Sequence, residues 1–420
     1  MIIQEIRSLF AVAPKPYRAA TFQDPPTFCH VSRPFRHDSC PHRNRWAIDG
    51  TDLATIRRRL VGEWDHPRMH GWVAELGEER EIVGVIRGCI KTVTCGKKLP
   101  RSARNATDDP TTTKAAVPVY TKAAYILGLR VSLPHRRMGI GLRLVRRLES
   151  WFASMGAEYA YMATDSDNSP SLSLFTRRLS YQNFRTPSIL VHPVHPHHDL
   201  SLSKNVQILS LPPLEAESLY RRLLSTTEFF PRDIDSVLQN KLNLGTFLAL
   251  PSDTNFANME SFLSLPPESW AVLSVWNSKD VFRLQVRGAS KLKKMCAKMS
   301  RVFDRLFPWL MIPSVPEVFR PFGLYFLYGL GGEGTAKVRL IRALCKMAHN
   351  MARKGGCGVV ATEVGVLEPL RAGVPHWARF SCEEDLWCVK RLGEDYSDGS
   401  VGDWTKSAPG ASIFVDPRDF

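Results

Sequence analysis

The run Arg136-Arg137-Met138-Gly139-Ile140-Gly141 is the most informative stretch of this 420-residue sequence. It follows an apolar segment, Tyr125 to Val131, and leads into a run with helical spacing of apolar residues, Leu142 to Met155. Two glycines let backbone N–H groups approach an anion, the start of a helix presents its positive end, and two arginines add charge. The stretch therefore predicts a cradle for a diphosphate. For so short a pattern, an ordinary glycine turn with solvated arginines is the alternative.

The segments around this run predict a mixed α/β fold (α+β). Upstream, Gly71 to Thr94 holds two apolar segments around a charged turn, which indicates a β-hairpin. Downstream, Tyr159 to Thr164 predicts a strand, and Asn168 with Pro170 predicts the capped start of a helix. The order of hairpin, strand, glycine loop, helix, strand and helix resembles that of the GNAT acetyltransferases.

The resemblance to GNAT enzymes also covers the glycine loop. Their coenzyme A pattern is Arg or Gln, two residues, Gly, any residue, then Gly or Ala, and Arg136, Gly139 and Gly141 fill its three fixed places. The resemblance implies acetyl-CoA as cosubstrate, with backbone groups at the end of the central strand facing its pantetheine arm or thioester. The implied cofactor contacts are Val131, Arg136, Arg137, Met138, Gly139, Ile140, Gly141, Leu142, Asn168 and Phe175.

The sequence leaves the proton-transfer groups open. In the superfamily the usual general acid is the tyrosine of a Leu-Tyr pair in the last core helix, and here that pair is Leu174-Phe175, whose phenyl ring cannot donate a proton. The central strand segment, Tyr125 to Val131, carries no carboxylate. The catalytic candidates that remain are Asp165, Asp167 and His135, each of which could instead cap a loop or bind nothing.

Composition bounds the class of protein. The formal net charge is +15 and the pI is about 9.5, which favours an anionic partner such as coenzyme phosphates, an acidic protein or nucleic acid. No apolar run reaches the ~20 residues that a membrane-spanning helix needs, so no membrane partner is expected. Nine cysteines, without paired spacing and without a secretory leader, favour reduced thiols in the cytosol or nucleus.

Shifts in composition along the chain predict four parts. Residues 1–57 are rich in Pro, His and Arg without periodicity and are expected to be largely disordered. Residues 58–194 are predicted to form the acetyltransferase domain, 195–205 a linker, and 206–420 a second domain with a C-terminal tail. Within the first domain, Cys95 to Lys122 is polar and aperiodic, and we expect a mobile insertion there.

The second half of the sequence repeats the pattern of the first. Leu324 to Leu330 predicts a strand, Gly331 to Gly334 a glycine turn, Val338 to Met351 a helix, and Val359 to Thr362 another strand. We therefore expect a tandem of two GNAT-like domains. The second is expected to be degenerate, because the carboxylate of Glu333 replaces the arginines of the first loop and opposes a diphosphate.

A basic amphipathic helix is predicted over Lys291 to Phe307. Direct contact of this helix with nucleic acid or with an acidic protein is one interpretation. An ordinary solvated helix face is the other, and it is the more common case.

No metal site is expected, because neither group of candidate ligands has a standard ligand spacing. The histidines between the two halves are interpreted as a solvated linker, and the group near the N-terminus as part of the disordered segment. The first group is His192, His195, His197 and His198, and the second is Cys29, His30, His37, Cys40 and His42.

Three long runs, Ile82 to Gly96, Ser225 to Asp235 and Gly402 to Ser407, resemble the Hookless family of plant N-acetyltransferases. The resemblance covers about Glu81 to Phe420 and implies a nuclear regulator of differential cell growth, with the cytoplasm as the second choice of compartment. It implies acetyl-CoA-dependent acetylation of a protein amine, in a histone or another chromatin protein. The alternative is a regulatory or scaffold protein of the same fold that binds an acyl-CoA without turnover, which Phe175 favours.

Overall fold

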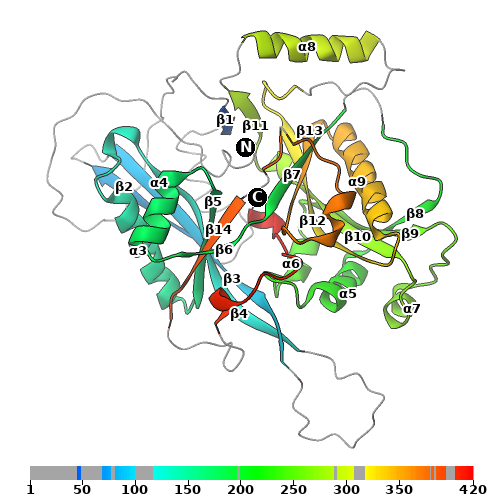
Figure 1. The fold of residues 1–420 in the computed structure, drawn as a ribbon, viewed down its shortest axis with the longest axis horizontal. Helices are drawn as coiled ribbons and strands as arrows, with labels where there is room; N and C mark the ends of the chain where they lie inside the picture. The colour runs from blue at the N-terminus through cyan, green and yellow to red at the C-terminus, as the bar shows by residue number, and fades with distance from the viewer. Residues whose placement is uncertain are drawn as a thin grey trace, which may run out of the picture.

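The computed structural model describes residues 45–48, 69–76, 81–99, 117–195, 199–287, 291–306, 317–378, 380–382, 385–393 and 403–419. Two six-stranded mixed sheets lie side by side, with helices on their faces (Figure 1). This arrangement confirms the predicted mixed α/β class.

The first sheet contains the predicted hairpin and the glycine loop. Its strands, in order across the sheet, are β2 (Met69–Leu76), β3 (Glu81–Leu99), β4 (Val117–Val131), β5 (Tyr159–Asp165), β14 (Asp385–Arg391) and β6 (Gln182–Arg185). The strands β4 and β5 run parallel and are joined by α3 (Ile140–Ser154). Apolar residues recur on one face of α3 and are buried against the sheet, as Leu144, Leu148 and Phe152 show.

The helix after β5 begins where the sequence predicts. The side chain of Asn168 accepts a hydrogen bond from the N–H of Ser171, 3.4 Å away, and so caps α4 (Ser169–Leu172). The chain continues as a π-helical segment, η2 (Ser173–Arg178), which buries Phe175.

Two strands extend into the predicted mobile insertion at Cys95 to Lys122, one from each end. The strand β3 continues to Leu99 and β4 begins at Val117, so only residues 100–116 lie outside the described residues. The second half of the chain packs against β3 just before this stretch: Thr94 N–H donates to Phe230 O over 3.0 Å, and Phe229 N–H donates to Thr94 O over 2.9 Å.

The second sheet, like the first, contains one parallel pair among antiparallel strands. In order, its strands are β7 (Ser188–Pro193), β13 (Cys357–Val364), β12 (Gly323–Glu333), β10 (Trp270–Asn277), β9 (Asn243–Pro251) and β8 (Val206–Leu211). Its helices are α5 (Pro213–Leu224), α6 (Ile234–Leu238), α7 (Met259–Ser264) and α9 (Lys337–Lys354). The helix α9 joins the parallel strands β12 and β13, as α3 joins β4 and β5. This order supports a second GNAT-like domain, which stays a prediction.

Each half contributes one strand to the other half's sheet. The strand β7 precedes the predicted linker but pairs with β13 in the second sheet, while β14 comes from the far end of the chain and pairs with β5 and β6 in the first. Figure 1 shows β14 in orange among the blue and green strands, and β7 in green beside β13. The predicted domain boundaries at residues 194 and 206 therefore place β7 with the first sheet and β14 with the second, whereas each strand pairs in the other sheet.

Aromatic rings fill the seam between the sheets. The ring of Tyr161 lies 4.6 Å from Tyr125, 5.0 Å from Phe229 and 5.7 Å from Trp387, measured between ring centroids. Trp387 belongs to the exchanged strand β14, and Phe229 belongs to the loop between α5 and α6. The exchange thus joins the two halves in one continuous core.

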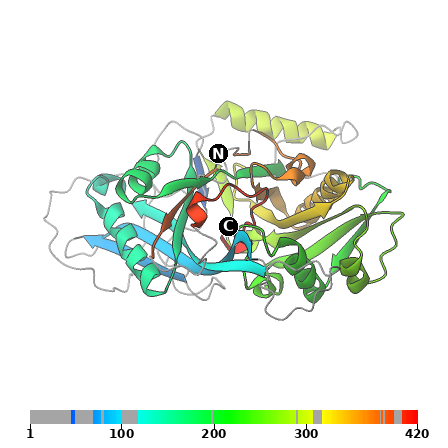
Figure 2. The same ribbon diagram turned by 60° about the horizontal axis from the view of Figure 1, so that its bottom comes forward.

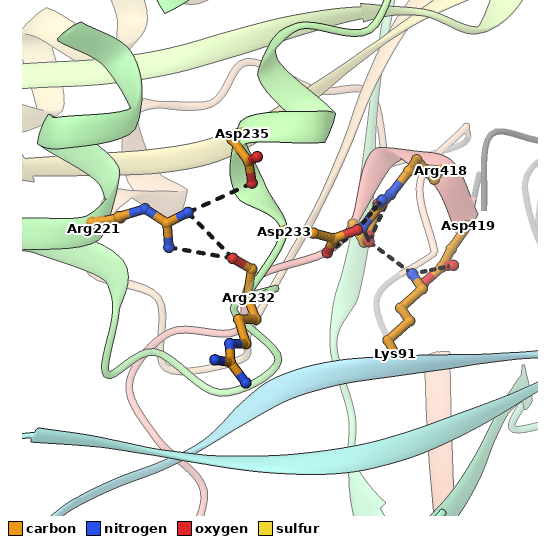
Figure 3. Close-up of polar contacts among 8 residues, drawn as sticks. Lys91, Arg221, Arg232, Asp233, Asp235, Arg418 and Asp419 are labelled. Atoms are coloured by element: carbon orange, nitrogen blue, oxygen red, sulfur yellow. Dashed lines mark hydrogen bonds and ion pairs between the residues drawn. The ribbon is translucent and has the colours of Figure 1, made fainter. Parts of the chain in front are cut away.

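Buried charges fasten the C-terminal segment to both halves (Figure 3). Lys91 on β3 forms ion pairs with Asp416, 2.9 Å away, and with Asp419. Arg418 forms ion pairs with Asp416 and with Asp233 beside α6, both at 2.7 Å. Burial alone would lower the pKa of Lys91, but the carboxylates of Asp416 and Asp419 raise it on balance.

The segment 1–57, which was expected to be largely disordered, contributes at least one strand. The strand β1 (Arg45–Ile48) pairs antiparallel with β11 (Leu284–Arg287). Residues 1–44 and 49–57, including the N-terminal Cys and His group, lie outside the described residues.

The predicted basic amphipathic helix forms as α8 (Lys291–Leu306). It stands apart from both sheets in two views (Figures 1 and 2). Ala297 is buried, but the large apolar side chains Leu292, Met295, Met299, Val302, Phe303 and Leu306 are exposed. None of the helices among the described residues combines the length and apolar character needed to cross a bilayer.

Candidate active site

A cleft of about 1090 Å³ opens where β4 and β5 separate. The two strands pair from Ala123 and Tyr159 as far as Ile126 and Met162, and then part. The separation coincides with a bulge in β4, where Gly128 adopts a φ of 57° and the register with β3 shifts. The bulge and the parting strands leave room for a ligand to pass between β4 and β5.

The glycine loop forms one end of this cleft. Gly139 has a φ of 79° and caps α3, and an added Cβ there would meet no atom within 4 Å. Arg143 N–H donates to Gly139 O over 3.1 Å, so the amides of Ile140, Gly141 and Leu142 precede the first such bond of the helix. Open space before these amides, at the positive end of α3, fits a diphosphate.

Several arginines line the cleft. The guanidinium of Arg136 donates through Nε to Val131 O over 3.2 Å, which holds the loop against the end of β4. Arg137, Arg177 and Arg178 also line the cleft. Four cationic side chains along the cleft favour an anionic ligand.

The corresponding loop of the second half is closed. Gly334 has a φ of 82°, close to that of Gly139, but an added Cβ would lie 1.9 Å from Glu268 O. The amide of Ala336 at the start of α9 donates to the hydroxyl of Ser269 over 3.2 Å. The chain itself therefore fills the space that a diphosphate would need, and Glu333 adds a like charge, which supports the predicted structural role of this loop.

Nine of the ten predicted cofactor contacts line the cleft: Val131, Arg136, Arg137, Gly139, Ile140, Gly141, Leu142, Asn168 and Phe175. The exception is Met138, which is 46% exposed and is not among the lining residues. A loop that turns through Arg137 and Gly139 at positive φ leaves the side chain between them on the outside.

The three predicted catalytic candidates also line the cleft, but each has local contacts. Asp165 Oδ1 accepts from the N–H of Asp167 over 2.9 Å, which is a loop-capping contact of the kind expected as the alternative. His135 is buried in the turn before the loop, with Nδ1 3.4 Å from Ser132 Oγ.

Phe175 occupies the cleft wall where the superfamily places a tyrosine. Among the described residues that line the cleft there is no tyrosine. The nearby Tyr181 packs edge-on against Phe175 with ring centroids 5.1 Å apart, and burial, followed by Glu149, raises the pKa of its hydroxyl well above the ordinary value. Tyr181 is therefore a core residue.

Sequence reasoning missed two charged residues of the cleft. Arg130 follows the bulge in β4, and burial, followed by the neighbouring Arg87, lowers its pKa well below the ordinary value. Asp385 is fully buried and reaches the cleft from β14. No local pattern could have identified Asp385, because only the exchange of strands brings it beside Asp165.

The solvated histidine linker is a wrong prediction for the described residues. His192 and His195 pack with His349 of α9, and one ligand atom from each ring lies within 4.8 Å of the others. The N–H of His195 donates to His349 Nε2 over 2.9 Å. Burial, followed by His349 and His195, lowers the pKa of His192 to about 3. His197 and His198 lie outside the described residues.

Comparison with known proteins agrees with this geometry. The model of the family described as "Acetyltransferase (GNAT) family" matches residues 33–181, and so begins before the predicted domain start at 58. The Arabidopsis thaliana "Probable N-acetyltransferase HLS1-like" is 59% identical over 360 residues, which cover 83% of this chain and 86% of that relative. "Probable N-acetyltransferase HLS1" from the same plant is 58% identical over 356 residues, covering 83% and 87%.

A more distant relative comes from rice. "Acetyl transferase GW6a" of Oryza sativa subsp. japonica is 44% identical over 356 residues, which cover 83% of this chain and 77% of that relative. Identity of this extent over most of each chain, with the GNAT match on the half that forms the cleft, shows that the chain belongs to the Hookless (HLS1) family of probable N-acetyltransferases in the GNAT superfamily.

Proposed function

We propose that this protein transfers the acetyl group of acetyl-CoA to an amine of a protein, with a lysine of a histone or another chromatin protein as the acceptor. The observation that carries the proposal is the difference between the two glycine loops. The Gly139 loop leaves the amides at the start of α3 open to the cleft, whereas an added Cβ at Gly334, two residues before the N-cap of α9, would lie 1.9 Å from Glu268 O. Only the first loop has the space and charge for a coenzyme diphosphate.

The rest of the cleft suits an extended thioester. Amide transfer needs the thioester carbonyl held beside the acceptor amine, with hydrogen-bond donors for the charge that develops on its oxygen. The bulge at Gly128 shifts the register of β4 against β3, and β4 and β5 part after Ile126 and Met162, where the cleft opens. The nuclear location and the role in differential growth follow the family resemblance and are part of the proposal.

A second candidate function is an acyl-CoA-binding regulator without turnover. Phe175 favours it, because the residue stands where the superfamily has its phenol and offers no proton to the leaving thiolate. A thiolate that leaves unaided, or that takes its proton from water, is compatible with the first candidate.

The experiment that separates the two candidates combines binding with turnover. Purified protein, isotopically labelled acetyl-CoA and core histones are incubated, and the histones are analysed by mass spectrometry. We expect labelled lysines with wild type and none with Arg136→Ala or Gly139→Asp. Tight acetyl-CoA binding by calorimetry, without label on any protein or peptide amine, would instead establish the non-catalytic function.

A further inference from the structure

The exchanged strand β14 places a buried carboxylate in the wall of the cleft. Asp385 is the first residue of β14 and lies opposite Asp165 at the end of β5. Its exposed fraction is 0%, against 9% for His135, and Asp165 and Asp167 are more exposed still. Of the carboxylate and imidazole side chains that line the cleft in the described part of the chain, Asp385 is the one most shielded from water.

The position of Asp385 is fixed by its neighbours. Its N–H donates to Pro187 O over 3.0 Å, and its Oδ2 accepts from Trp387 Nε1 over 3.3 Å. The same indole N–H donates to Glu363 Oε1 of β13 over 3.0 Å. Trp387 is itself held in the seam by the stacked ring of Tyr161. One rigid indole therefore orients the carboxylate of Asp385 and ties it to the second sheet.

Asp385 lies on the face of the first sheet that is opposite α3. In a strand, residues two apart share a face, so Asp385 lies on the face of Trp387. Trp387 packs in the seam between the sheets, whereas Cys388 packs with α3 on the other face. The glycine loop and α3 thus lie at the coenzyme end of the cleft. Asp385 lines the cleft from the opposite face of the first sheet.

We propose that Asp385 is the general base that accepts the proton of the acceptor amine, with Trp387 as its positioning residue. The inference rests on the proposed acetyl transfer and names a residue for the step that the cofactor loop does not supply. Asp165 is the competing candidate, but its Oδ1 accepts from the N–H of Asp167 and stabilises the loop after β5.

Asp385 accepts a proton from the ammonium group of the acceptor, and the nitrogen lone pair that is freed forms the C–N bond with the acetyl carbonyl carbon. The C–S bond then breaks, and the thiolate takes up the second proton, which the tetrahedral nitrogen releases. The products are the amide, the free thiol of coenzyme A and protonated Asp385, which returns its proton to water.

The test compares two substitutions with opposite consequences. Asp385→Asn keeps the shape of the side chain and an acceptor for Trp387 but cannot take up a proton, while Asp385→Glu keeps the carboxylate and changes the shape. If Asp385 is the general base, kcat should fall by a factor of about 10² to 10⁴ in Asp385→Asn and by less in Asp385→Glu. A purely structural role predicts the reverse order, which would overturn the proposal.

Three further measurements make the result unambiguous. Acetyl-CoA affinity by calorimetry should be the same in wild type and Asp385→Asn, because the coenzyme end of the cleft is intact. The exposed Asp253→Asn should keep the wild-type kcat. A larger loss of kcat in Asp165→Asn than in Asp385→Asn would assign the base to Asp165 and overturn the inference. If wild type acetylates no amine, the proposed function fails; if wild type and Asp385→Asn are equally active, only this inference fails.

Discussion

Arg185 and Glu228 form a buried ion pair that joins the two halves of the molecule. The Nε of Arg185, on β6, donates to Glu228 Oε2 over 2.7 Å, and its Nη2 donates to the other carboxylate oxygen. Both side chains are almost fully buried, and Trp404 Nε1 also donates to Glu228 Oε1 over 3.1 Å. Each charge is shielded from water and has the other as its counter-charge, so removing one of them leaves the other buried and uncompensated.

We predict that Glu228→Gln lowers the free energy of unfolding by about 3 kcal/mol, because it leaves the charge of Arg185 buried without a counter-charge. Urea denaturation followed by tryptophan fluorescence measures the change. The double variant Arg185→Met with Glu228→Leu should lose less unfolding free energy than Glu228→Gln alone, because it leaves no buried charge. As a matched control, Asp199→Asn removes the exposed partner of Arg353 and should leave the midpoint nearly unchanged. Equal losses of stability on breaking the buried pair and the exposed pair would contradict the prediction.

Two substitutions at Gly139 should distinguish the effect of a larger side chain on acetyl-CoA binding from the effect of a negative charge. An added Cβ meets no atom within 4 Å there, so Gly139→Ala has room and suffers mainly from the positive φ, at roughly 1 kcal/mol. Gly139→Asp adds a carboxylate beside the diphosphate, a repulsion of several kcal/mol at an effective dielectric of about 20. We expect calorimetry to show acetyl-CoA binding to Gly139→Ala and none to Gly139→Asp.

The second loop provides the control for that experiment. Because the loop at Gly334 is filled by its own chain, Glu333→Gln should leave acetyl-CoA affinity unchanged. A large change in affinity would mean that the second loop takes part in binding. Binding that survives Gly139→Asp would remove the site from the first loop.

The parts of the site that the sequence predicts are those whose chemistry lies in consecutive residues. Gly139 must adopt a positive φ for the turn, and Asn168 must precede the helix that it caps. Each requirement is met within a few residues, so a short pattern is enough. The hairpin and the crossover helix α3 follow from periodicity in the same way.

The parts that the sequence does not predict depend on pairing between distant segments. Nothing in Asp385-Leu386-Trp387 distinguishes a strand that will pair with β5 from one that will stay in the second sheet. The same applies to His192, whose place beside His349 follows from the pairing of β7 with β13. A stretch rich in proline and histidine is typical of a linker, but here its residues pack against the second half of the chain.

The buried histidine cluster should make stability fall at acidic pH. Burial, His349 and His195 hold the pKa of His192 at about 3 in the folded protein, whereas the unfolded chain has the ordinary value of 6.5. The unfolded state therefore binds the proton more tightly, and the stability that His192 contributes above pH 6.5 is lost as the pH falls toward 3.

We predict that the loss in unfolding free energy between pH 7.5 and 4.5 is smaller in His192→Gln than in wild type, by about 2 kcal/mol. His195, His349 and His376 face the same ring and are left unchanged in the comparison. Urea denaturation at both pH values measures the difference. Parallel losses in the two proteins would show that the ring is not held neutral by the fold.

The carboxyl group of Asp419 should have the opposite pH dependence. Burial raises its pKa to about 6, with Lys91 opposing and Asp416 reinforcing the shift, against an ordinary value of 3.8 (Figure 3). The folded state binds this proton more tightly than the unfolded chain, so the stability from Asp419 is complete below pH 3.8 and is lost as the pH rises through 6.

Asp419→Asn removes this titration and keeps an oxygen that can accept from Lys91. We predict that wild type exceeds Asp419→Asn in stability by more at pH 4.5 than at pH 7, because only wild type carries the titrating carboxyl. The difference is measured by urea denaturation of both proteins at pH 4.5, 5.5 and 7. The ion pair of Lys91 with Asp416 is common to both proteins and cancels. An advantage of wild type that grows with pH would mean that attraction to Lys91 outweighs burial, so that Asp419 is ionised throughout the range and stabilises the junction as a charge.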